Sequence, residues 1–232
     1  MEREVKPELL DQLSPEDPRA IHSRRDLKRI NFWMGNAGHI ARTLKRVTHA
    51  PKEILEVGCG DGSLSAALAR KFAHQWPGVR LTLLDMTPAI PTQTVDQIRA
   101  TGWEMEIMQA DLRLWAKRAP ERQYDCIIAN LFMHHFQNAE LVDFFRVFAE
   151  RTQLFVACDP RRWRVSLMSV PLLRLLGCND VTLHDARISI IAGFCGKELT
   201  ELWPADSGFH IEEREEGFSS HLFAAYRKGA IA

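Results

Sequence analysis

The chain has 232 residues, and its 30 basic and 30 acidic side chains cancel, so no overall field attracts it to nucleic acid. Apolar residues make up 46% and charged residues 26%, which is typical of a globular protein with one sizeable core. No uncharged apolar run approaches the roughly 18 residues that a membrane span needs, and Met-Glu-Arg-Glu-Val lacks the apolar core of a signal peptide. The sequence therefore excludes a membrane-spanning helix and predicts one main domain.

The five cysteines are scattered, and no two of them form a C-x-x-C pair (Cys59, Cys126, Cys158, Cys178 and Cys195). This spacing argues against a zinc site or a disulfide framework and predicts a cytoplasmic protein.

Charge is unevenly placed along the chain. Nine Lys or Arg and a single acid lie between Arg19 and Lys52, whereas four glutamates lie within residues 212–216. Both runs can be solvated surface. Alternatively, the basic run is an N-terminal arm that touches an acidic partner, a membrane surface or the protein's own acidic face.

The first 49 residues predict an N-terminal helical arm or lid. Residues 1–18 are polar and rich in proline, and we expect a loose lead-in there. Residues 19–49 have a helical pattern that Gly35 and Gly38 divide into two helices.

Residues 50–232 predict the main domain, in which short apolar strands alternate with amphipathic helices. Asn138 is the expected N-cap of one of these helices. The predicted strands lie near residues 53–58, 79–85, 103–108, 124–129 and 153–158. Two further runs, Phe209–Arg214 and His221–Arg227, are joined too closely for a crossover helix and must pair antiparallel. The fold class is therefore α/β, a Rossmann-like, doubly wound, mostly parallel seven-stranded sheet with a C-terminal antiparallel hairpin and a helical insertion near 160–195.

A glycine-rich turn follows the first predicted strand and begins a helix pattern. Gly58, Gly60 and Gly62 alternate there, and Ser63 stands where a dinucleotide fingerprint requires its third glycine. Glycine suits a tight turn whose backbone a ligand approaches closely. Because Glu56 places a carboxylate beside this turn, the pattern favours a zwitterionic or cationic ligand over a diphosphate.

Ligands of open α/β sheets bind beyond the carboxyl ends of the strands, so the strand ends supply the candidate site. Asp85 after the second strand suits ribose hydroxyls, or it is a turn or cap acid. Asp111 after the third accepts from an exocyclic amine, or it caps the next helix. The fourth strand ends at Asn130 and is followed by an adjacent pair, His134 and His135.

Glu56–Gly62, Asp85, Asp111 and the Asn130–Phe136 run together resemble the class I S-adenosylmethionine-dependent methyltransferases over roughly residues 50–160. This resemblance implies S-adenosylmethionine as the cofactor. It also implies that the glycines admit the methionine part, that Glu56 orients the ammonium group and that Asp85 holds the ribose. The remaining positions would meet the adenine or the transferable methyl group, and the whole implied set is Glu56, Gly58, Cys59, Gly60, Gly62, Asp85, Met86, Asp111, Leu112 and Asn130.

A looser resemblance joins Arg25–Asn31 and His184–Ile190 to small-molecule methyltransferases found beside polyketide and aromatic-lipid biosynthesis enzymes. It implies a small apolar or phenolic acceptor that is methylated on oxygen or carbon. A phenol benefits from a base, and the candidates are His134, His135 and, behind them, His184. No metal is expected, because the fourth and fifth strands end with only Asn130 and an isolated Asp159.

The insertion at 160–195 has an apolar part that either walls a pocket for a greasy acceptor or is ordinary core packing. Its arginines, Arg161, Arg162 and Arg164, suggest peripheral contact with a membrane that holds a lipidic acceptor. Two other functions remain open: an NAD-dependent oxidoreductase, and a non-catalytic methyltransferase-like scaffold that binds RNA or protein through residues 19–52. The enzyme interpretation expects a small-molecule substrate and no nucleic acid.

Overall fold

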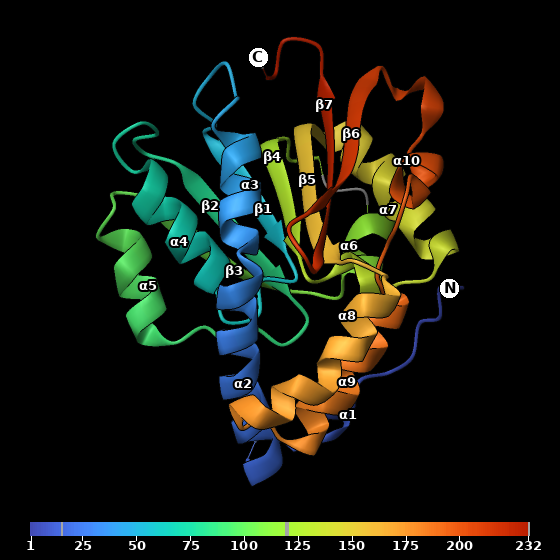
Figure 1. Cartoon of the computed structure of the whole chain (residues 1–232). Helices are drawn as coiled ribbons and strands as arrows, with labels where there is room; N and C mark the ends of the chain where they lie inside the picture. The colour runs from blue at the N-terminus through green and yellow to red at the C-terminus, as the bar shows by residue number, and fades with distance from the viewer. Residues whose placement is uncertain (15, 119–120, 232) are drawn as a thin grey trace.

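The computed structural model describes residues 1–14, 16–118 and 121–231, and its centre is a seven-stranded sheet of order β3-β2-β1-β4-β5-β7-β6 (Figure 1). The first five strands pair in parallel, and β7 runs antiparallel between β5 and β6. The predicted fold class is therefore confirmed. The strands are β1 (Glu53–Val57), β2 (Arg80–Asp85), β3 (Glu104–Gln109), β4 (Tyr124–Asn130), β5 (Thr152–Pro160), β6 (Phe209–Glu216) and β7 (Ser220–Arg227).

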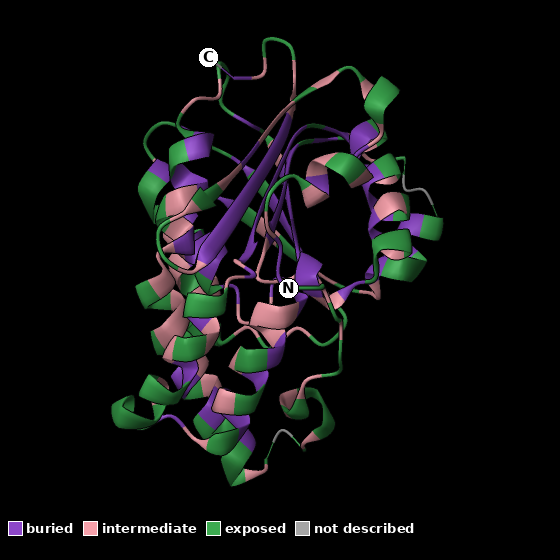
Figure 2. Cartoon of the chain, turned by 45° about the vertical axis from the view of Figure 1, so that its right-hand side comes forward, coloured by how far each residue is buried: buried purple, intermediate pink, exposed green. Residues whose placement is uncertain are grey.

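Helices cover both faces of the sheet, so most residues of its central strands are buried (Figure 2). One apolar core lies under the helices α3 (Asn36–Leu44), α4 (Ser63–Phe72) and α5 (Thr92–Arg99). The other lies under α6 (Leu112–Lys117), α7 (Asn138–Arg151) and α10 (Glu198–Leu202). A parallel strand buried on two faces needs an almost continuous apolar run, which explains why these strands were readable in the sequence.

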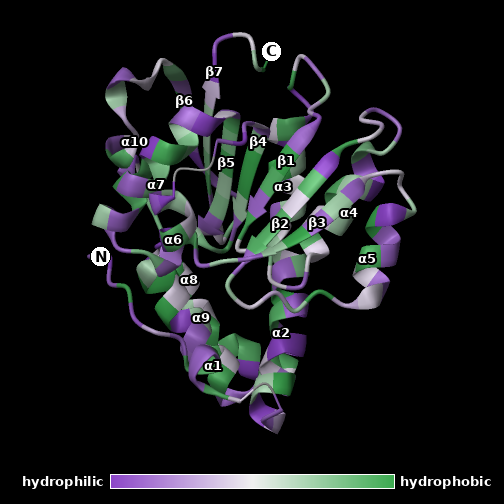
Figure 3. Cartoon of the chain, turned by 180° about the vertical axis from the view of Figure 1, so that it is seen from behind, coloured by the Kyte–Doolittle hydropathy of each residue, from purple (hydrophilic) through white to green (hydrophobic). Residues whose placement is uncertain are grey.

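A third group of elements lies beyond the carboxyl ends of the parallel strands (Figures 1 and 3). It combines the N-terminal helices with the predicted insertion, and Asp26 joins them by accepting hydrogen bonds from the backbone N–H of Asn179 (3.0 Å) and the hydroxyl of Thr182 (3.0 Å). The division into residues 1–49 and 50–232 stays a prediction. The group consists of α1 (Leu9–Gln12), α2 (Pro18–Met34), α8 (Arg164–Ser169), the 3-10 helix η2 (Val170–Leu176) and α9 (Asp180–Ala192). Two further 3-10 turns are η1 (Met133–His135) and η3 (Ala205–Ser207).

The N-terminal segment, residues 1–14, is docked on the rest of the molecule, so the expected loose lead-in is wrong. The Arg3 guanidinium donates to the backbone oxygens of Ala192 (2.7 Å) and Phe136 (2.7 Å). The backbone N–H groups of Leu9 and Leu10 donate to the buried carboxylate of Asp185 at 2.8 and 3.0 Å. These charge-assisted hydrogen bonds hold the segment across the carboxyl ends of the strands.

Replacing Arg3 by alanine is expected to loosen the N-terminal segment without unfolding the sheet, because several hydrogen bonds from one charged group are lost at once. Hydrogen bonds to charged groups contribute about 1.5–3 kcal/mol each at most. Amide hydrogen exchange of residues 4–12 should accelerate at least tenfold in Arg3→Ala, whereas exchange in β4 and β5 should stay unchanged. Equal protection of residues 4–12 in both proteins would contradict the anchoring role.

Two boundary predictions were also wrong. Only Gly35 divides the N-terminal helices: it has φ +70°, a conformation that glycine adopts readily, and it ends α2 while preceding α3. Gly38 lies inside α3. The N-cap of α7 is Gln137, whose capping box with Glu140 makes Asn138 the first helical residue.

The basic run of residues 19–52 meets the protein's own acidic face. Arg42 forms an ion pair with Glu216 (2.8 Å), and Arg46 forms one with Glu212 (2.8 Å). Tyr226 donates to the same Glu212, and these partners lower the pKa of Glu212 to about 2. Of the alternatives open from the sequence, this run is at least partly an internal contact between α3 and the C-terminal hairpin.

The three arginines of residues 161–164 do not form a common basic surface, which removes the basis of the predicted membrane contact. Arg162 is buried and donates to the backbone oxygen of Gly193 (2.9 Å) and to the carboxylate of Glu198. Arg161 pairs with Glu215, and only Arg164 is exposed. Within the described ranges, no helix combines the length and the apolar character that crossing a membrane requires.

Candidate active site

The glycine loop, residues 58–62, connects β1 to α4 at the carboxyl edge of the sheet. Gly58, Gly60 and Gly62 have φ of +68°, +52° and +70°, values that other residues rarely adopt. A Cβ on Gly58 would lie 2.1 Å from the ring of Phe132, whereas a Cβ on Gly60 would meet nothing within 4 Å. Gly58 is therefore required by packing, and Gly60 faces open space that a ligand can enter.

Asp85, at the end of β2, is brought against this loop as the sequence predicted. Its two carboxylate oxygens accept from the backbone N–H of Gly60 (2.9 Å) and of Thr87 (2.8 Å). A carboxylate has about four acceptor positions, so room remains for the hydroxyls of a ligand. Its assignment to ribose stays a prediction.

Glu56, in β1, is buried and accepts a hydrogen bond from the hydroxyl of Ser65 on α4. Burial raises its pKa to about 8, although the Ser65 hydrogen bond acts in the opposite direction, and the nearby charges of Asp61 and Asp85 raise it further. The carboxyl group is therefore largely protonated at neutral pH in this structure. A cationic group placed beside it would favour the ionised form.

Replacing Glu56 by glutamine is expected to flatten the pH dependence of stability. The folded-state pKa of about 8 lies above the model value of 4.5, so wild-type stability is fully present below pH 4.5 and is lost as pH rises toward 8. The slope approaches about 1.4 kcal/mol per pH unit between these values. Urea unfolding at pH 5, 6, 7 and 8 should show Glu56→Gln gaining on the wild type as pH rises, and parallel curves would contradict a protonated Glu56.

The other implied cofactor residues lie at neighbouring strand ends. Asp111 caps α6 by accepting a hydrogen bond from the backbone N–H of Arg113 (2.8 Å), so it has the helix-capping role that the sequence left open for it. Leu112 is buried behind it. Met86 is 63% exposed after β2, in a position free to cover a flat ligand. Cys59 is buried within the glycine loop, and burial raises the pKa of its thiol.

Asn130, at the end of β4, is part of a polar chain that joins three elements. Its side-chain oxygen accepts from the amide of Asn36 on α3 (2.9 Å). The oxygen of Asn36 in turn accepts from the hydroxyl of Ser220 on β7 (2.6 Å). These hydrogen bonds fix the orientation of Asn130, and its place beside a methyl group remains a prediction.

The His134–His135 pair lies directly after β4, where the backbone makes an unusual turn. Leu131 has φ +51°, a left-handed conformation that costs a non-glycine residue about 1–3 kcal/mol and is frequent at functional sites. The backbone N–H groups of Phe132 and His134 then donate to one oxygen of Asp159, at 3.0 and 3.2 Å. Asp159 therefore holds the turn as well as the histidine.

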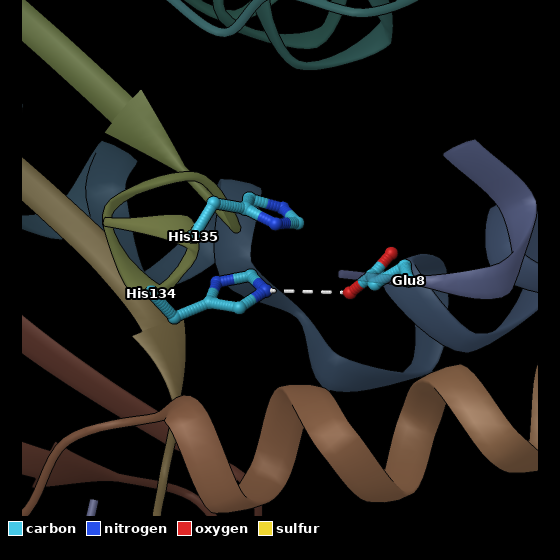
Figure 4. Close-up of side chains that lie close together, drawn as sticks. All are labelled: Glu8, His134 and His135. Carbon is cyan, nitrogen blue, oxygen red and sulfur yellow. Dashed lines mark ion pairs between the residues drawn. The ribbon is translucent and has the colours of Figure 1, made fainter. Parts of the chain in front are cut away.

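His134 is buried between two carboxylates. Its Nδ1 lies 2.8 Å from Oδ1 of Asp159, and its Nε2 lies 3.8 Å from Oε1 of Glu8 (Figure 4). Although burial acts in the opposite direction, these two partners raise the pKa of His134 to about 9. Burial and the neighbouring His134 lower the pKa of His135 to about 4. At neutral pH the two imidazoles thus differ in charge.

Glu8 was missed by sequence reasoning. It belongs to a polar segment far from the histidines in the chain, and it reaches them because Asp185 anchors Leu9 and Leu10. Asp159 was noticed only as an isolated acid, although its place at the carboxyl end of β5 should have assigned it to the site.

His184 is placed apart from this group. It is half exposed on α9, and its Nδ1 lies 3.0 Å from the carboxylate of its neighbour Asp185. A ligand atom of Glu8, of His134 and of His135 all lie within 4.8 Å of one another, and His184 is not part of this Glu8–His134–His135 cluster. The candidate histidines are therefore divided into a clustered pair and a separate residue.

The predicted apolar lid is present but largely uncovered. Met168, Leu172 and Leu175 on α8 and η2 are 77%, 58% and 82% exposed. Nearby, Trp33 on α2 and Leu176 on η2 line a hollow of about 120 Å³ together with Arg29, Ile30 and Cys178. These side chains are therefore not ordinary core packing.

Comparison with known proteins identifies the central part of the chain. Residues 54–153 match the family model described as a methyltransferase domain. A malonyl-[acyl-carrier protein] O-methyltransferase of Paenibacillus sp. (strain JDR-2) is 34% identical over 92 residues, 39% of this chain and 32% of that protein. A trans-aconitate 2-methyltransferase of Escherichia fergusonii is 31% identical over 77 residues, 33% of this chain and 26% of that protein. The matched parts span about a third or less of these relatives.

The fold is shared over a much larger part of the chain. The solved structure of the plantazolicin methyltransferase BpumL in complex with SAH superimposes with a TM-score of 0.66, covering 94% of both chains at 12% sequence identity. The matched region contains the glycine loop, Asp85, Asp111, Asn130 and the histidine pair. Residues 54–153 therefore match a methyltransferase domain, and the chain shares the fold of a solved methyltransferase structure.

Proposed function

We propose that this protein transfers a methyl group from S-adenosylmethionine to a small-molecule acceptor. The observation that carries the proposal is the match of residues 54–153 to a methyltransferase domain, within which the glycine loop and Asp85 meet at the carboxyl edge of the sheet. The names of two relatives, a malonyl-[acyl-carrier protein] O-methyltransferase and a trans-aconitate 2-methyltransferase, support a small organic acid group as the acceptor, carried by a protein in the first case and free in the second.

The cofactor would lie along the strand ends between the glycine loop and β4. The open space at Gly60 suits the methionine part, and Asp85 beside it suits the ribose hydroxyls. Met86 and Asp111 with Leu112 would surround the adenine. Glu56 would ionise as the ammonium group arrives, and Asn130 would lie beside the sulfonium methyl.

The reaction needs little chemistry beyond positioning, because the sulfonium already activates the methyl group. An acceptor lone pair forms a bond to the methyl carbon while the carbon–sulfur bond breaks, and its electron pair stays on sulfur to give S-adenosylhomocysteine. An oxygen or carbon acceptor must also lose a proton. We assign that step to the His134–His135 pair as a unit, because Asp159 holds it at the carboxyl end of β4 next to the loop residue Phe132. His184 takes no part in this assignment.

The exposed side chains of α8 and η2 support an apolar or phenolic acceptor methylated on oxygen or carbon. They lie on the same segment as Leu176, which lines the hollow together with Trp33 of α2. A lipidic acceptor delivered at a membrane surface fits the same exposed apolar side chains. Arg162 is buried, so the membrane contact would rest on these apolar side chains and not on the arginines. The five free cysteines fit the predicted cytoplasmic location.

The two alternative functions have less support. An NAD-dependent oxidoreductase is opposed by the methyltransferase-domain match and by Ser63 in place of a third fingerprint glycine. An RNA-binding scaffold would need the cations of residues 19–52 to be available, but Lys28, Arg42 and Arg46 pair with acids of the same chain.

The proposal is tested by isothermal titration of the purified protein with S-adenosylmethionine and with NAD, followed by incubation with labelled methyl donor and a metabolite extract. We expect saturable binding of S-adenosylmethionine and a labelled small-molecule product. Binding of NAD without binding of S-adenosylmethionine would overturn the proposal, and so would RNA binding with steep salt dependence in the absence of any S-adenosylmethionine binding.

Replacing Asp85 by alanine is expected to weaken S-adenosylmethionine binding by about 1–3 kcal/mol, the usual loss for a hydrogen bond to a charged group. Calorimetry measures the change directly. Asp96→Ala, which removes an exposed carboxylate from α5, is the matched control and should bind like the wild type. Unchanged affinity in Asp85→Ala would remove this residue from the cofactor site.

A further inference from the structure

We propose that Glu8, His134 and His135 bind a divalent transition-metal cation. The cluster brings two imidazoles and one carboxylate together from segments far apart in the sequence: the N-terminal segment and the turn after β4 (Figure 4). No metal was expected from the sequence, because the fourth and fifth strands end with only Asn130 and an isolated Asp159, and Glu8 was not considered as a ligand.

The ligand atoms are of the right kind and nearly at the right spacing. Ligands about 2.0–2.2 Å from a tetrahedral ion lie roughly 3.3–3.5 Å from one another. Nε2 of His134 and Oε1 of Glu8 are 3.8 Å apart, and one ligand atom of each of the three residues lies within 4.8 Å of the others. A small rotation of the His135 or Glu8 side chain closes the remaining gap. Two nitrogen ligands favour zinc, cobalt or iron over magnesium or calcium, which prefer oxygen alone.

The surroundings hold the ligands as they are held in known metal centres. A metal-ligating histidine usually donates its second ring N–H to a carboxylate, which fixes the tautomer and turns the other nitrogen toward the ion. Asp159 does this for His134: it is fully buried, 2.8 Å from Nδ1, and is itself fixed by two backbone N–H groups. Nε2 then faces Glu8, whose carboxylate is oriented by the hydroxyl of Ser189 on α9.

The charge of the cluster favours a cation. Glu8 and Asp159 are two carboxylates in a largely buried place on either side of His134, whose imidazole can balance only one of them, and an uncompensated buried charge is costly. Arg3, which donates to the backbone oxygen of His134, directs its hydrogen bonds to backbone oxygens and to Asn138 rather than to either carboxylate. A divalent ion on the Nε2 side of His134 would balance both charges.

The role of the ion rests on the proposed function. Three protein ligands leave at least one coordination position open, as in catalytic zinc sites. An acceptor oxygen bound there would have a lowered pKa and would lose its proton near neutral pH. The His134–His135 pair would thus activate the acceptor by holding the cation.

The test is titration of the full-length, chelator-treated protein with Co²⁺ and with Zn²⁺, without cofactor or acceptor. We expect one ion per chain, a visible Co²⁺ absorption band of imidazole–carboxylate coordination, and a higher Tm with either ion. Glu8→Gln keeps the side-chain volume and an acceptor for Ser189 but removes the anionic ligand. It and His135→Ala should each weaken binding at least tenfold and abolish the Tm increase.

His22→Ala is the matched control, because His22 is an exposed histidine 3.6 Å from the carboxylate of Asp26, outside the cluster. It should bind Co²⁺ like the wild type. Absence of saturable binding, or equal binding in Glu8→Gln and the wild type, would overturn the metal site. The titration uses no S-adenosylmethionine, so it tests the metal site separately from the proposed function. Methyl transfer without Co²⁺ binding would reject only the metal site. Co²⁺ binding without S-adenosylmethionine binding would reject only the proposed function.

Discussion

Replacing His135 by alanine is expected to lower kcat for methyl transfer by about 10²–10⁴-fold, the usual contribution of a group that manages a proton in the transition state. The affinity for S-adenosylmethionine should stay within a factor of two, because the cofactor would lie along the strand ends and the glycine loop. The residue is only half buried, so the variant should fold. Single-turnover kinetics with labelled cofactor, once an acceptor is identified, measures the change, and calorimetry measures the affinity.

His74→Ala is the control for this experiment, since His74 is exposed after α4 and belongs to no part of the site described above. Its kcat should match the wild type. Full turnover in His135→Ala would mean that the acceptor loses its proton elsewhere. A parallel loss of cofactor affinity would instead place His135 in the cofactor site, contrary to the division of the site proposed above.

Alanine at Gly58 is expected to act mainly on stability, whereas alanine at Gly60 is expected to act mainly on cofactor binding. Both positions have positive φ, which costs an alanine about 1–2 kcal/mol. At Gly58 the new methyl group would also overlap the ring of Phe132 at 2.1 Å, and such overpacking adds about 1–3 kcal/mol. Gly58→Ala should therefore lower the free energy of unfolding by roughly 2–5 kcal/mol, as measured in urea.

Gly60→Ala adds a methyl group where nothing lies within 4 Å, so its stability should fall only by the backbone cost. If the cofactor occupies that open space, its affinity should fall at least tenfold in calorimetry. The two variants thus separate packing from binding within one loop. Wild-type affinity in Gly60→Ala would show that the cofactor stays away from this backbone position.

The sheet could be predicted because the signals for its strands lie in short stretches of the sequence. Strands buried on both faces need nearly continuous apolar runs, and the short Glu215–Ser220 connection forces the last two to be antiparallel. The rule that ligands meet the carboxyl ends of strands then located Asp85, Asn130 and the histidine pair at one edge. The N-cap of α7 was misplaced by one residue. Asn138 is the stronger N-cap signal in the sequence, but Gln137 caps the helix through a reciprocal capping box with Glu140.

The acceptor side of the site could be predicted only in part, since its contacts join distant segments. Arg3 bonds to residues 131 to 189 positions away, and α1 is only four residues long, too short for a periodic pattern. Arg162 looked like part of a basic surface, yet Glu198 and backbone oxygens compensate its charge in the interior. No local pattern of residue types reveals such pairings.

The docking of the N-terminal segment has a consequence for how the protein matures on the ribosome. Residues 1–12 are made more than 170 residues before Asp185 and Ala192, which anchor them. The glycine loop and strands β1 to β5 lie within residues 53–160 and can assemble earlier, since chains fold progressively during synthesis. The two halves of the site would therefore form at different times, and the growing chain would hold a finished cofactor loop before Glu8 reaches His134.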